Sequence, residues 1–353
     1  DAARIVDELA GALRRPTPVH GHELFATVSI GVALYPQDAA SVDELVRNAD
    51  TALNLAKRDG DGFAFFTADM NARVAEYLTL ETRLRRAVER DEFGVDLQPR
   101  VEVATGRVTG AEALVRWRHP ELGTVLPGQF IRLAEETGLV VPIGERVLRE
   151  ACRIGSSWPA ALARARVSVN LSARQFRQGR ELCALVRDVL AQTRLAPERL
   201  ELEITESVLM ERPDDAVATM RELASLGLTL AIDDFGTGYS SLSYLKHLPV
   251  KTLKIDQSFI AGLPHDAEDL AIVTAVVALA RALGLSVVAE GVETNEQLAC
   301  LRRLGCNEIQ GYLACRPVEP AEFLRRLERG GLSDPHDGGG ALPGSVTPLR
   351  RGA

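Results

Sequence analysis

The chain has 353 residues, of which 46% are hydrophobic and 25% are charged, as in ordinary soluble globular proteins. Because a domain typically holds about 100–200 residues, this length indicates more than one domain. The formal net charge of −8 argues against a protein that coats a nucleic-acid polymer or an anionic membrane.

The cysteines and the longest apolar runs bear on the cellular compartment. The five cysteines form no C-x-x-C pair, and their odd number fits a reduced chain with buried structural thiols. No apolar run approaches the about 18 residues of a membrane-spanning helix, and no signal peptide is visible. The six histidines lack the spacing of zinc ligands. We therefore expect a cytoplasmic protein with no membrane segment in this chain.

Residues 1–67 predict a small α/β segment. Helical spacing marks 3–13 and 42–60, and the stretch 24–36 between them predicts a strand pair or one long strand. A short strand follows at 63–67. These are about half of the elements of a complete sheet domain. The segment therefore resembles the second half of such a domain.

The rest of the chain predicts a linking helix, a barrel and a tail. Residues 68–90 are helical and charged. Over 91–330, short apolar runs alternate with helical segments, which is typical of a parallel sheet, and their number favours closure into a TIM-type (β/α)8 barrel. Residues 331–353 are rich in Gly and Pro and predict a disordered tail.

Seven of the apolar runs in the barrel region end on a polar or charged residue. These residues are Glu112, Asn170, Glu203, Asp233, Lys254, Glu290 and Gln310, at spacings of 58, 33, 30, 21, 36 and 20 residues. The carboxyl ends of parallel barrel strands form the rim where barrel enzymes build their sites. We therefore expect these side chains to converge.

Converging carboxylates indicate a metal site. One acidic residue after a strand is usually a helix N-cap or a solvated loop residue. That explanation weakens as the pattern recurs, and it is weakest at the adjacent pair Asp233 and Asp234. Several carboxylates on one rim would repel one another without cations between them, and oxygen ligands favour Mg²⁺ or Mn²⁺ over zinc.

The order of the motifs gives a specific resemblance. Glu112-Ala113-Leu114 is followed by Val115-Arg116-Trp117 and then by VNLSARQF, LELEITES, IDDFGTGYSSLSYLKHLPVKTLKIDQSFI, VVAEGVET and IQGYL. The whole set resembles the EAL-domain cyclic di-GMP phosphodiesterases. The resemblance implies a modified TIM barrel that hydrolyses the bacterial second messenger cyclic di-GMP to the linear dinucleotide pGpG.

The resemblance also implies two Mg²⁺ or Mn²⁺ ions per active site. Four side chains would hold the first ion: Glu112, Asn170, Glu203 and Asp233. Asp233 would bridge to a second ion held by Asp234 and Glu290. Two-metal sites of this kind activate a water and stabilise both the attacking and the leaving oxygen.

Further side chains match positions that act on the substrate or on the attacking water. Lys254 matches the lysine that contacts this water, and Glu290 could serve as general base as well as metal ligand. Gln98 and Gln310 match positions that face the dinucleotide. Arg116 would bind a substrate phosphate through its planar fork.

The loop after Asp234 contains a Gly-x-Gly, which alone usually marks a tight turn. Its place behind the twin aspartates resembles the family loop that couples metal binding to dimer contacts, which implies a homodimer through the barrel. Glu206 matches the glutamate that anchors this loop, and it would contribute to catalysis indirectly, by holding the loop in place. Possible donors to it in the loop are Thr237, Tyr239, Ser240 and Ser241.

Residues 1–67 resemble the C-terminal part of a GGDEF diguanylate cyclase domain, through VSIGVALYP and NADTALNLAKRDG. The GGDEF signature loop is absent from this chain, so we expect no cyclase activity from it. Departures from the EAL pattern at Leu97 and Arg132 bear on the substrate pocket, because neither is a metal position.

Two other functions compete with the phosphodiesterase. A catalytically silent cyclic di-GMP receptor would act through partner domains, but such receptors typically lose an acidic position and none is lost here. An unrelated two-metal sugar-phosphate hydrolase would require the loop and the Gln and Arg matches to be accidental. The sequence therefore favours the enzyme.

Overall fold

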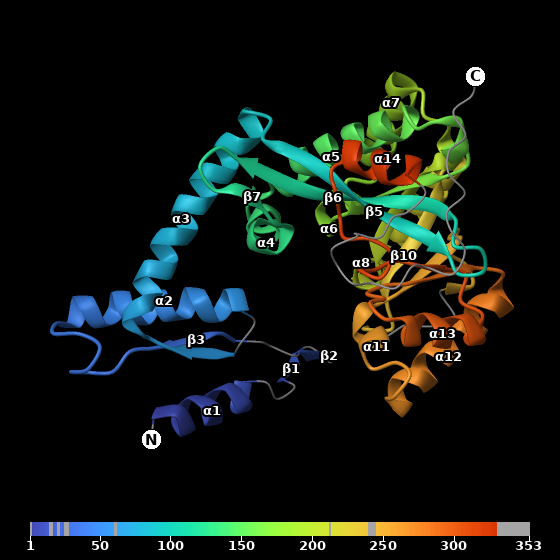
Figure 1. Cartoon of the computed structure of the whole chain (residues 1–353). Helices are drawn as coiled ribbons and strands as arrows, with labels where there is room; N and C mark the ends of the chain where they lie inside the picture. Colours follow the sequence, from blue (N-terminus) through green and yellow to red (C-terminus); the bar gives the residue numbers. More distant parts are fainter. Residues whose placement is uncertain are drawn as a thin grey trace. The chain divides into compact units, whose positions relative to one another are not determined.

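A computed structural model of the protein describes residues 2–13, 17–19, 22–24, 28–59, 62–211, 213–238 and 245–329. The chain divides into two compact units, Asp1–Arg83 and Leu84–Ala353, and each is described by itself (Figure 1). The predicted disordered tail, 331–353, lies outside the described residues.

The N-terminal unit contains helices and two small sheets. Its elements are α1 (Ala2–Leu13), β1 (Thr17–Val19), β2 (His22–Leu24), β3 (Ile30–Val32), α2 (Val42–Asp59), β4 (Phe63–Phe65) and the first part of α3 (Ala68–Glu89). Strands β1 and β2 pair antiparallel, whereas β3 and β4 pair in parallel. Of the described residues between 28 and 36, only Ile30–Val32 form a strand, because β4 offers partners to just these three.

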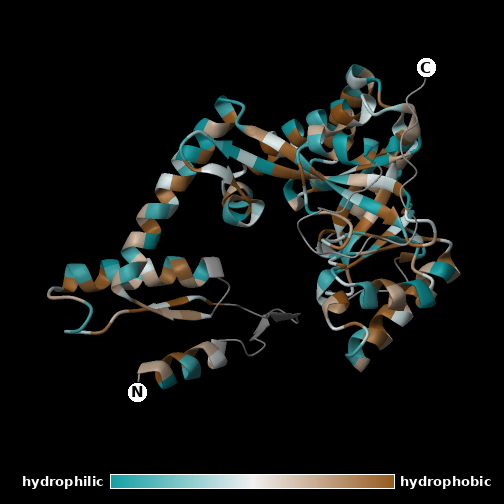
Figure 2. Ribbon diagram, viewed as in Figure 1, coloured by the Kyte–Doolittle hydropathy of each residue, from teal (hydrophilic) through white to brown (hydrophobic). Residues whose placement is uncertain are grey.

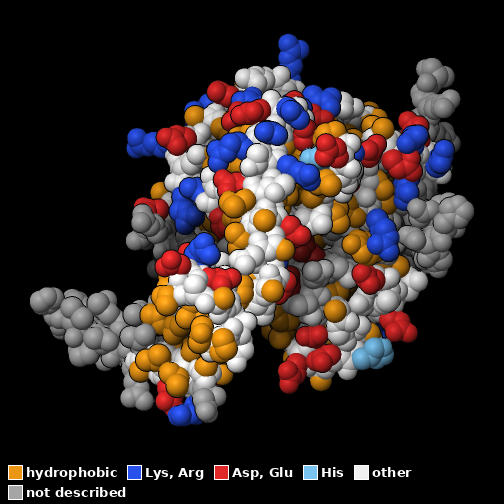
Figure 3. Space-filling view, turned by 90° about the vertical axis from the view of Figure 1, so that its left-hand side faces the viewer, with side chains coloured by type: hydrophobic (Ala, Val, Ile, Leu, Met, Phe, Trp, Pro, Cys, Tyr) orange, Lys and Arg blue, Asp and Glu red, His pale blue; other side chains and the backbone are white. Residues whose placement is uncertain are grey.

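The core of this unit is small. Ala52, Leu55, Phe66 and Met70 form its buried cluster. Strand β3 lies so close to α2 that a Cβ on Gly31 would come within 2.0 Å of a helix carbonyl oxygen, so only glycine fits there. Large apolar side chains stay exposed on the same unit, and Figure 3 shows hydrophobic side chains gathered there: Ile5, Leu9, Leu34, Tyr35, Val42 and Val46.

The second unit is a closed barrel of eight strands. They are β5 (Phe93–Glu102), β6 (Val108–His119), β8 (Arg166–Leu171), β9 (Leu200–Thr205), β10 (Thr229–Phe235), β11 (Thr252–Ile255), β12 (Ser286–Ala289) and β13 (Glu308–Ile309). Around the barrel the order is β5-β13-β12-β11-β10-β9-β8-β6, and β6 pairs with β5 to close it. Strand β5 is antiparallel to both neighbours, while the others run parallel. This confirms the predicted modified TIM barrel.

Helices surround the barrel, as the alternating pattern predicts. The longer ones are α4 (Pro127–Thr137), α5 (Val140–Ser156), α7 (Arg180–Thr193), α9 (Pro213–Ser225), α12 (Ala267–Leu283), α13 (Asn295–Leu304) and α14 (Pro320–Glu328). Figure 2 shows hydrophobic and hydrophilic residues alternating along them, as expected for helices with one face on a sheet. None of the helices in the described ranges is both long and apolar enough to cross a lipid bilayer.

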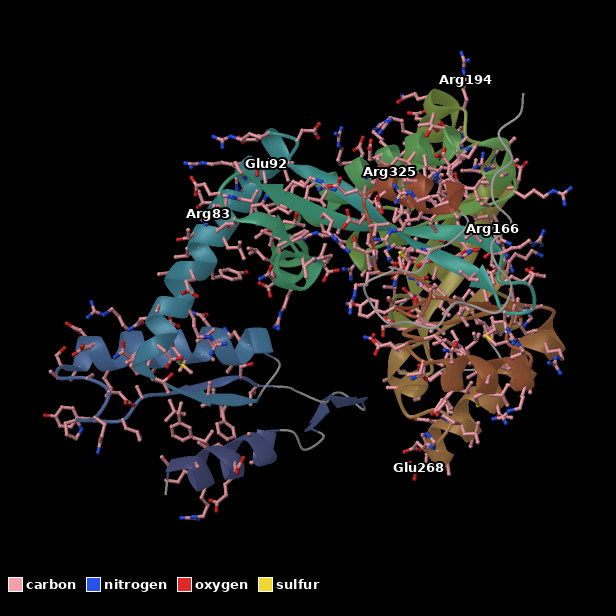
Figure 4. The ribbon with its side chains drawn as sticks, viewed as in Figure 1. Arg83, Glu92, Arg166, Arg194, Glu268 and Arg325 are labelled. Carbon is pink, nitrogen blue, oxygen red and sulfur yellow. The ribbon has the colours of Figure 1, made fainter. Side chains whose placement is uncertain are left out.

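An aromatic cluster packs under α4 at the start of the barrel sheet. Phe93, Trp117 and Phe130 lie with ring centroids 5.7–6.0 Å apart, and all are buried. Glu92, which is labelled in Figure 4, accepts the Trp117 indole N–H through its Oε2 at 2.9 Å, so the only polar atom of the indole is satisfied. The cluster packs at one end of the β5–β6 pair, and Gln98 and Glu112 are paired opposite each other in its middle.

All five cysteines are free and buried. Burial raises the pKa of the Cys152 and Cys306 thiols to about 12 and that of Cys183 to about 11. Thiolates, not thiols, are the reactive form, so these side chains serve as small apolar packing groups.

We expect the native protein to react very slowly with a thiol reagent such as dithionitrobenzoate at pH 8. With a pKa of about 12, roughly one in ten thousand of the Cys152 and Cys306 thiols is ionised at that pH, and the other three thiols are buried as well. Unfolding in guanidinium should expose all five. Rapid release of two or more equivalents of thionitrobenzoate from the folded protein would contradict the burial of the five thiols.

Candidate functional site

A pocket of about 350 Å³ opens at the carboxyl ends of the parallel strands, a size within the range of small-molecule sites. It is lined by Gln98, Glu112, Leu114, Asp233, Asp234, Lys254, Asp256, Gln257, Glu290, Gly291, Glu293, Gln310, Gly311 and Tyr312. Parallel strands place their last side chains at one rim, which is why residues so far apart in sequence meet here.

Lys254 lies among four carboxylates at this rim. It is the next-to-last residue of strand β11, and its side chain is 1% exposed. Its Nζ lies 2.5 Å from Glu203 Oε2, 2.6 Å from Glu290 Oε1, 3.1 Å from Asp233 Oδ1 and 3.7 Å from Glu112 Oε2. An ammonium carries one positive charge and three N–H donors, so it offsets part of this negative charge and cannot satisfy every oxygen.

The carboxylates respond to this environment in different ways. Burial and the neighbouring Glu112 and Asp233 raise the pKa of Glu203 despite the attraction of Lys254. Burial, opposed by Lys254 and reinforced by Asp233, raises the pKa of Glu290 to about 8. Burial also acts on Glu112, but Lys254 and hydrogen bonds outweigh it and lower its pKa. The site thus concentrates negative charge that one cation balances only in part.

A bulge near the end of strand β10 brings Asp233 and Asp234 to the same side of the sheet. Consecutive strand residues normally face opposite sides of a sheet. Here the β10–β11 register shifts between Ile232 and Phe235, and Asp234 adopts the left-handed region with φ 53°. The oxygens of Asp233, Asp234 and Glu290 consequently lie within 4.8 Å of one another. Burial, together with the charge of Asp233, raises the pKa of Asp234 to about 6.

The donor set fits a hard divalent cation. Its ligand atoms would be carboxylate and amide oxygens, which Mg²⁺ and Mn²⁺ prefer. Glu203 Oε1 and Gln310 Oε1 are buried and accept no hydrogen bond from the described residues, a costly state that a cation or its water would relieve.

An amide network surrounds Glu112. Asn170 Nδ2 donates to Glu112 Oε1, and Gln310 Nε2 donates to Glu112 Oε2 at 2.5 Å. Gln310 Nε2 also lies 3.0 Å from Gln98 Oε1, and Gln98 Nε2 donates to the Cys315 carbonyl at 3.3 Å. These predicted site residues therefore meet in one place, from β5, β6, β8 and the end of β13.

Arg116 is oriented by a neighbour that the sequence motifs do not single out. Its Nε donates to Asp96 Oδ2 at 2.8 Å, and its Nη1 donates to the Val115 carbonyl at 2.9 Å. The side chain is 8% exposed and is not among the pocket-lining residues named above. Asp96 also pairs with Arg118 at 3.2 Å, so one carboxylate fixes two arginines.

Glu206, the predicted loop anchor, contacts the loop. It begins α8 (Glu206–Glu211), is 3% exposed and accepts the Gly236 N–H at 3.2 Å. A Cβ on Gly238 would come within 3.1 Å of its Oε1. The Thr237 hydroxyl donates to the Asp234 carbonyl at 2.8 Å. The other donors predicted for this anchor, Tyr239, Ser240 and Ser241, lie outside the described residues.

Sequence reasoning missed several residues of the site. Three of them line the pocket and belong to motifs already noted: Asp256, Glu293 and Tyr312. Their positions shortly after strand ends could have identified them as site residues. Arg100 was missed altogether. It lies two residues after Gln98 on β5, and the strand period of two places both side chains on the inner face.

Two family profiles match the sequence. The diguanylate cyclase GGDEF domain matches residues 1–62, and the EAL domain matches residues 81–317, which is well over half of the chain. The chain belongs to the EAL domain family. Both predicted resemblances are confirmed, the N-terminal one as a short GGDEF-type fragment.

Curated relatives of this EAL chain are about twice its length. The bifunctional diguanylate cyclase/cyclic di-GMP phosphodiesterase MucR of Pseudomonas aeruginosa is 48% identical over 326 residues, 92% of this chain and 47% of MucR. The cyclic di-GMP phosphodiesterase PdeR of Escherichia coli is 40% identical over 318 residues, 90% of this chain and 48% of PdeR.

Solved structures share the fold. The c-di-GMP complex of the PaMucR phosphodiesterase has a TM-score of 0.67 and 48% identity, over 69% of this chain and 99% of that chain. The EAL enzyme Bd1971 in its cAMP- and cyclic-di-GMP-bound form has a TM-score of 0.69 and 31% identity, over 81% of this chain and 76% of that chain.

Replacing Lys254 by methionine should destabilise the metal-free EAL barrel. Removing one partner from a buried ion pair typically costs about 3–5 kcal/mol, and here several carboxylates lose their cation. The free energy of unfolding in urea, measured at pH 7 with EDTA, should fall by about that amount. Lys251→Met, at an exposed lysine just before β11, is the matched control. Equal losses in the two variants would show that the ion pairs contribute nothing.

Replacing Glu206 by glutamine should weaken Mg²⁺ binding while sparing the fold. The amide keeps the shape and one acceptor but loses the charge, and charge-assisted hydrogen bonds are roughly twice as strong as neutral ones. A looser loop would let Asp233 and Asp234 leave their geometry. The Mg²⁺ concentration for half-maximal activity should rise, and light scattering should report any change in association. Superimposable Mg²⁺ curves and masses would show that Glu206 is a bystander.

Proposed function

We propose that this EAL chain hydrolyses one phosphodiester bond of cyclic di-GMP to give linear pGpG, using two Mg²⁺ or Mn²⁺ ions. The observation that carries the proposal is the group of four carboxylates that converge on Lys254 in an open pocket. Burying like charges together is costly for a barrel, so the arrangement favours a functional site. The names of relatives such as MucR and PdeR support this substrate.

Six side chains would hold the metals: Glu112, Asn170, Glu203, Asp233, Asp234 and Glu290. Three of them already bring oxygens within 4.8 Å of one another. Bound metals would supply an activated water and stabilise charge on the phosphodiester oxygens. Glu290 would hold a metal or accept the proton of that water.

The remaining residues would bind and orient. Lys254 would hold the attacking water in line, because its Nζ lies at the centre of the carboxylate group. Gln98 and Gln310 line the pocket and would face polar groups of the dinucleotide. Arg116 would bind a phosphate with the N–H donors not engaged by Asp96 and Val115.

The decisive experiment incubates the pure chain with cyclic di-GMP and Mg²⁺ or Mn²⁺ and separates the products. Appearance of pGpG supports the enzyme. Binding without turnover would support the silent receptor instead. Absence of both would overturn the proposed substrate.

Replacing Glu112 by alanine should lower turnover by roughly 100-fold or more, because a carboxylate ligand and two hydrogen bonds are lost from the site. The circular dichroism spectrum should remain that of wild type. Glu181→Ala, at an exposed glutamate on α7, serves as control and should retain activity. Robust turnover by the Glu112→Ala protein would refute the metal assignment.

A further inference from the structure

Arg100 is a fully buried arginine inside the barrel, on the amino-terminal side of the site. Its side chain is 1% exposed and among the largest that the described barrel encloses. It extends from β5, whereas its partners come from β9 and β13, so it crosses the barrel interior. The family motifs quoted above give it no role.

One carboxylate anchors Arg100. Its Nη1 donates to Glu201 Oε1, and its Nε lies 3.4 Å from Glu308 Oε2. Glu201 is itself held by Arg166 Nη1 at 2.9 Å and by the Thr252 hydroxyl at 3.0 Å. With its carboxylate fixed from several strands, Glu201 leaves the guanidinium of Arg100 little freedom to move.

The anchored guanidinium faces a metal-ligand candidate. Arg100 Nη1 lies 3.6 Å from Glu203 Oε1, while Lys254 Nζ lies 2.5 Å from the other oxygen, Oε2. Glu203 is therefore held between two cations. Its Oε1 accepts no hydrogen bond from the described residues, so Arg100 attracts this oxygen without occupying it.

We propose that Arg100 is a positioning residue, which holds the Glu203 carboxylate in the orientation that metal binding requires. The inference rests on the proposed metal site. Partners that orient a ligand from behind commonly change metal affinity by roughly 10–100-fold when removed. Glu201, two residues earlier on β9, accepts a hydrogen bond from the same guanidinium nitrogen that faces Glu203.

Arg166 offers a matched comparison. It pairs with the same Glu201 from the first residue of β8 (Figure 4), but among the described carboxylates it pairs with no other. If Arg100 served only to neutralise Glu201, losing either arginine should have similar effects. If Arg100 positions Glu203, the loss of Arg100 should weaken metal binding and the loss of Arg166 should not.

The test is the rise in melting temperature of the full chain as Mn²⁺ is titrated, a readout that needs no substrate. For Arg100→Gln we expect the Mn²⁺ concentration that gives a fixed rise in melting temperature to increase roughly 10–100-fold. Arg166→Gln should stay near wild type, and Arg100→Lys, which keeps the charge, should recover part of the loss. Equal Mn²⁺ concentrations for Arg100→Gln and Arg166→Gln at that fixed rise would overturn the inference.

A second pair covers the case in which Arg100→Gln does not fold. The single variant Glu201→Gln is compared with the double variant Glu201→Gln/Arg100→Gln. In the double variant two amides replace the ion pair, so no unpaired carboxylate remains at position 201. If the double variant needs more Mn²⁺ for the same rise in melting temperature, the inference is supported, and an unchanged Mn²⁺ concentration refutes it. A wild-type protein whose melting temperature ignores Mn²⁺ would instead overturn the proposed metal site, and the inference with it.

Discussion

The ion pairs of Lys254 are the interaction on which the barrel's functional end depends. Four carboxylates, each in or just after a different strand, lie within 3.7 Å of one ammonium group that is 1% exposed. A buried carboxylate is costly to keep ionised, and the nearby cation lowers the cost of holding these carboxylates together. The same arrangement concentrates negative charge at the pocket, which is what a divalent cation requires.

The end of β10 shows how the chain adapts a regular strand to this requirement. Regular alternation would turn Asp234 away from Asp233, and the bulge with its left-handed residue turns it back. A non-glycine residue in that region costs on the order of 1–3 kcal/mol and persists only where neighbours enforce it. Here Glu206 binds Gly236, and the Thr237 hydroxyl binds the Asp234 carbonyl. The loop anchor therefore compensates for the strain that brings the two carboxylates together.

Periodicity predicted the regular elements well, because each depends on local sequence. The helices expected at 3–13 and 42–60 are α1 and α2, and their bounds differ from the expected ones by one residue at a single end. The convergence of the strand-end residues was also predictable, since it follows from parallel strands. The bulge was not, because nothing in LTLAIDD distinguishes it from a regular strand. Arg100 was not predictable either, because its partner Glu201 lies 101 residues away along the chain.

Arg100 and Arg116 show why residue type alone is insufficient. Both lie on adjacent strands and both bind carboxylates, yet one lies deep inside the barrel and the other at its rim. Asp96 and the Val115 carbonyl take two of the five N–H donors of Arg116 and fix the plane of its fork. Under the proposed function, the remaining donors of this side chain, which is 8% exposed, would bind a phosphate without reorientation. Arg100 has no such access, since it is enclosed by Glu201, Glu203 and Glu308, and its charge can act only through the carboxylates that it touches.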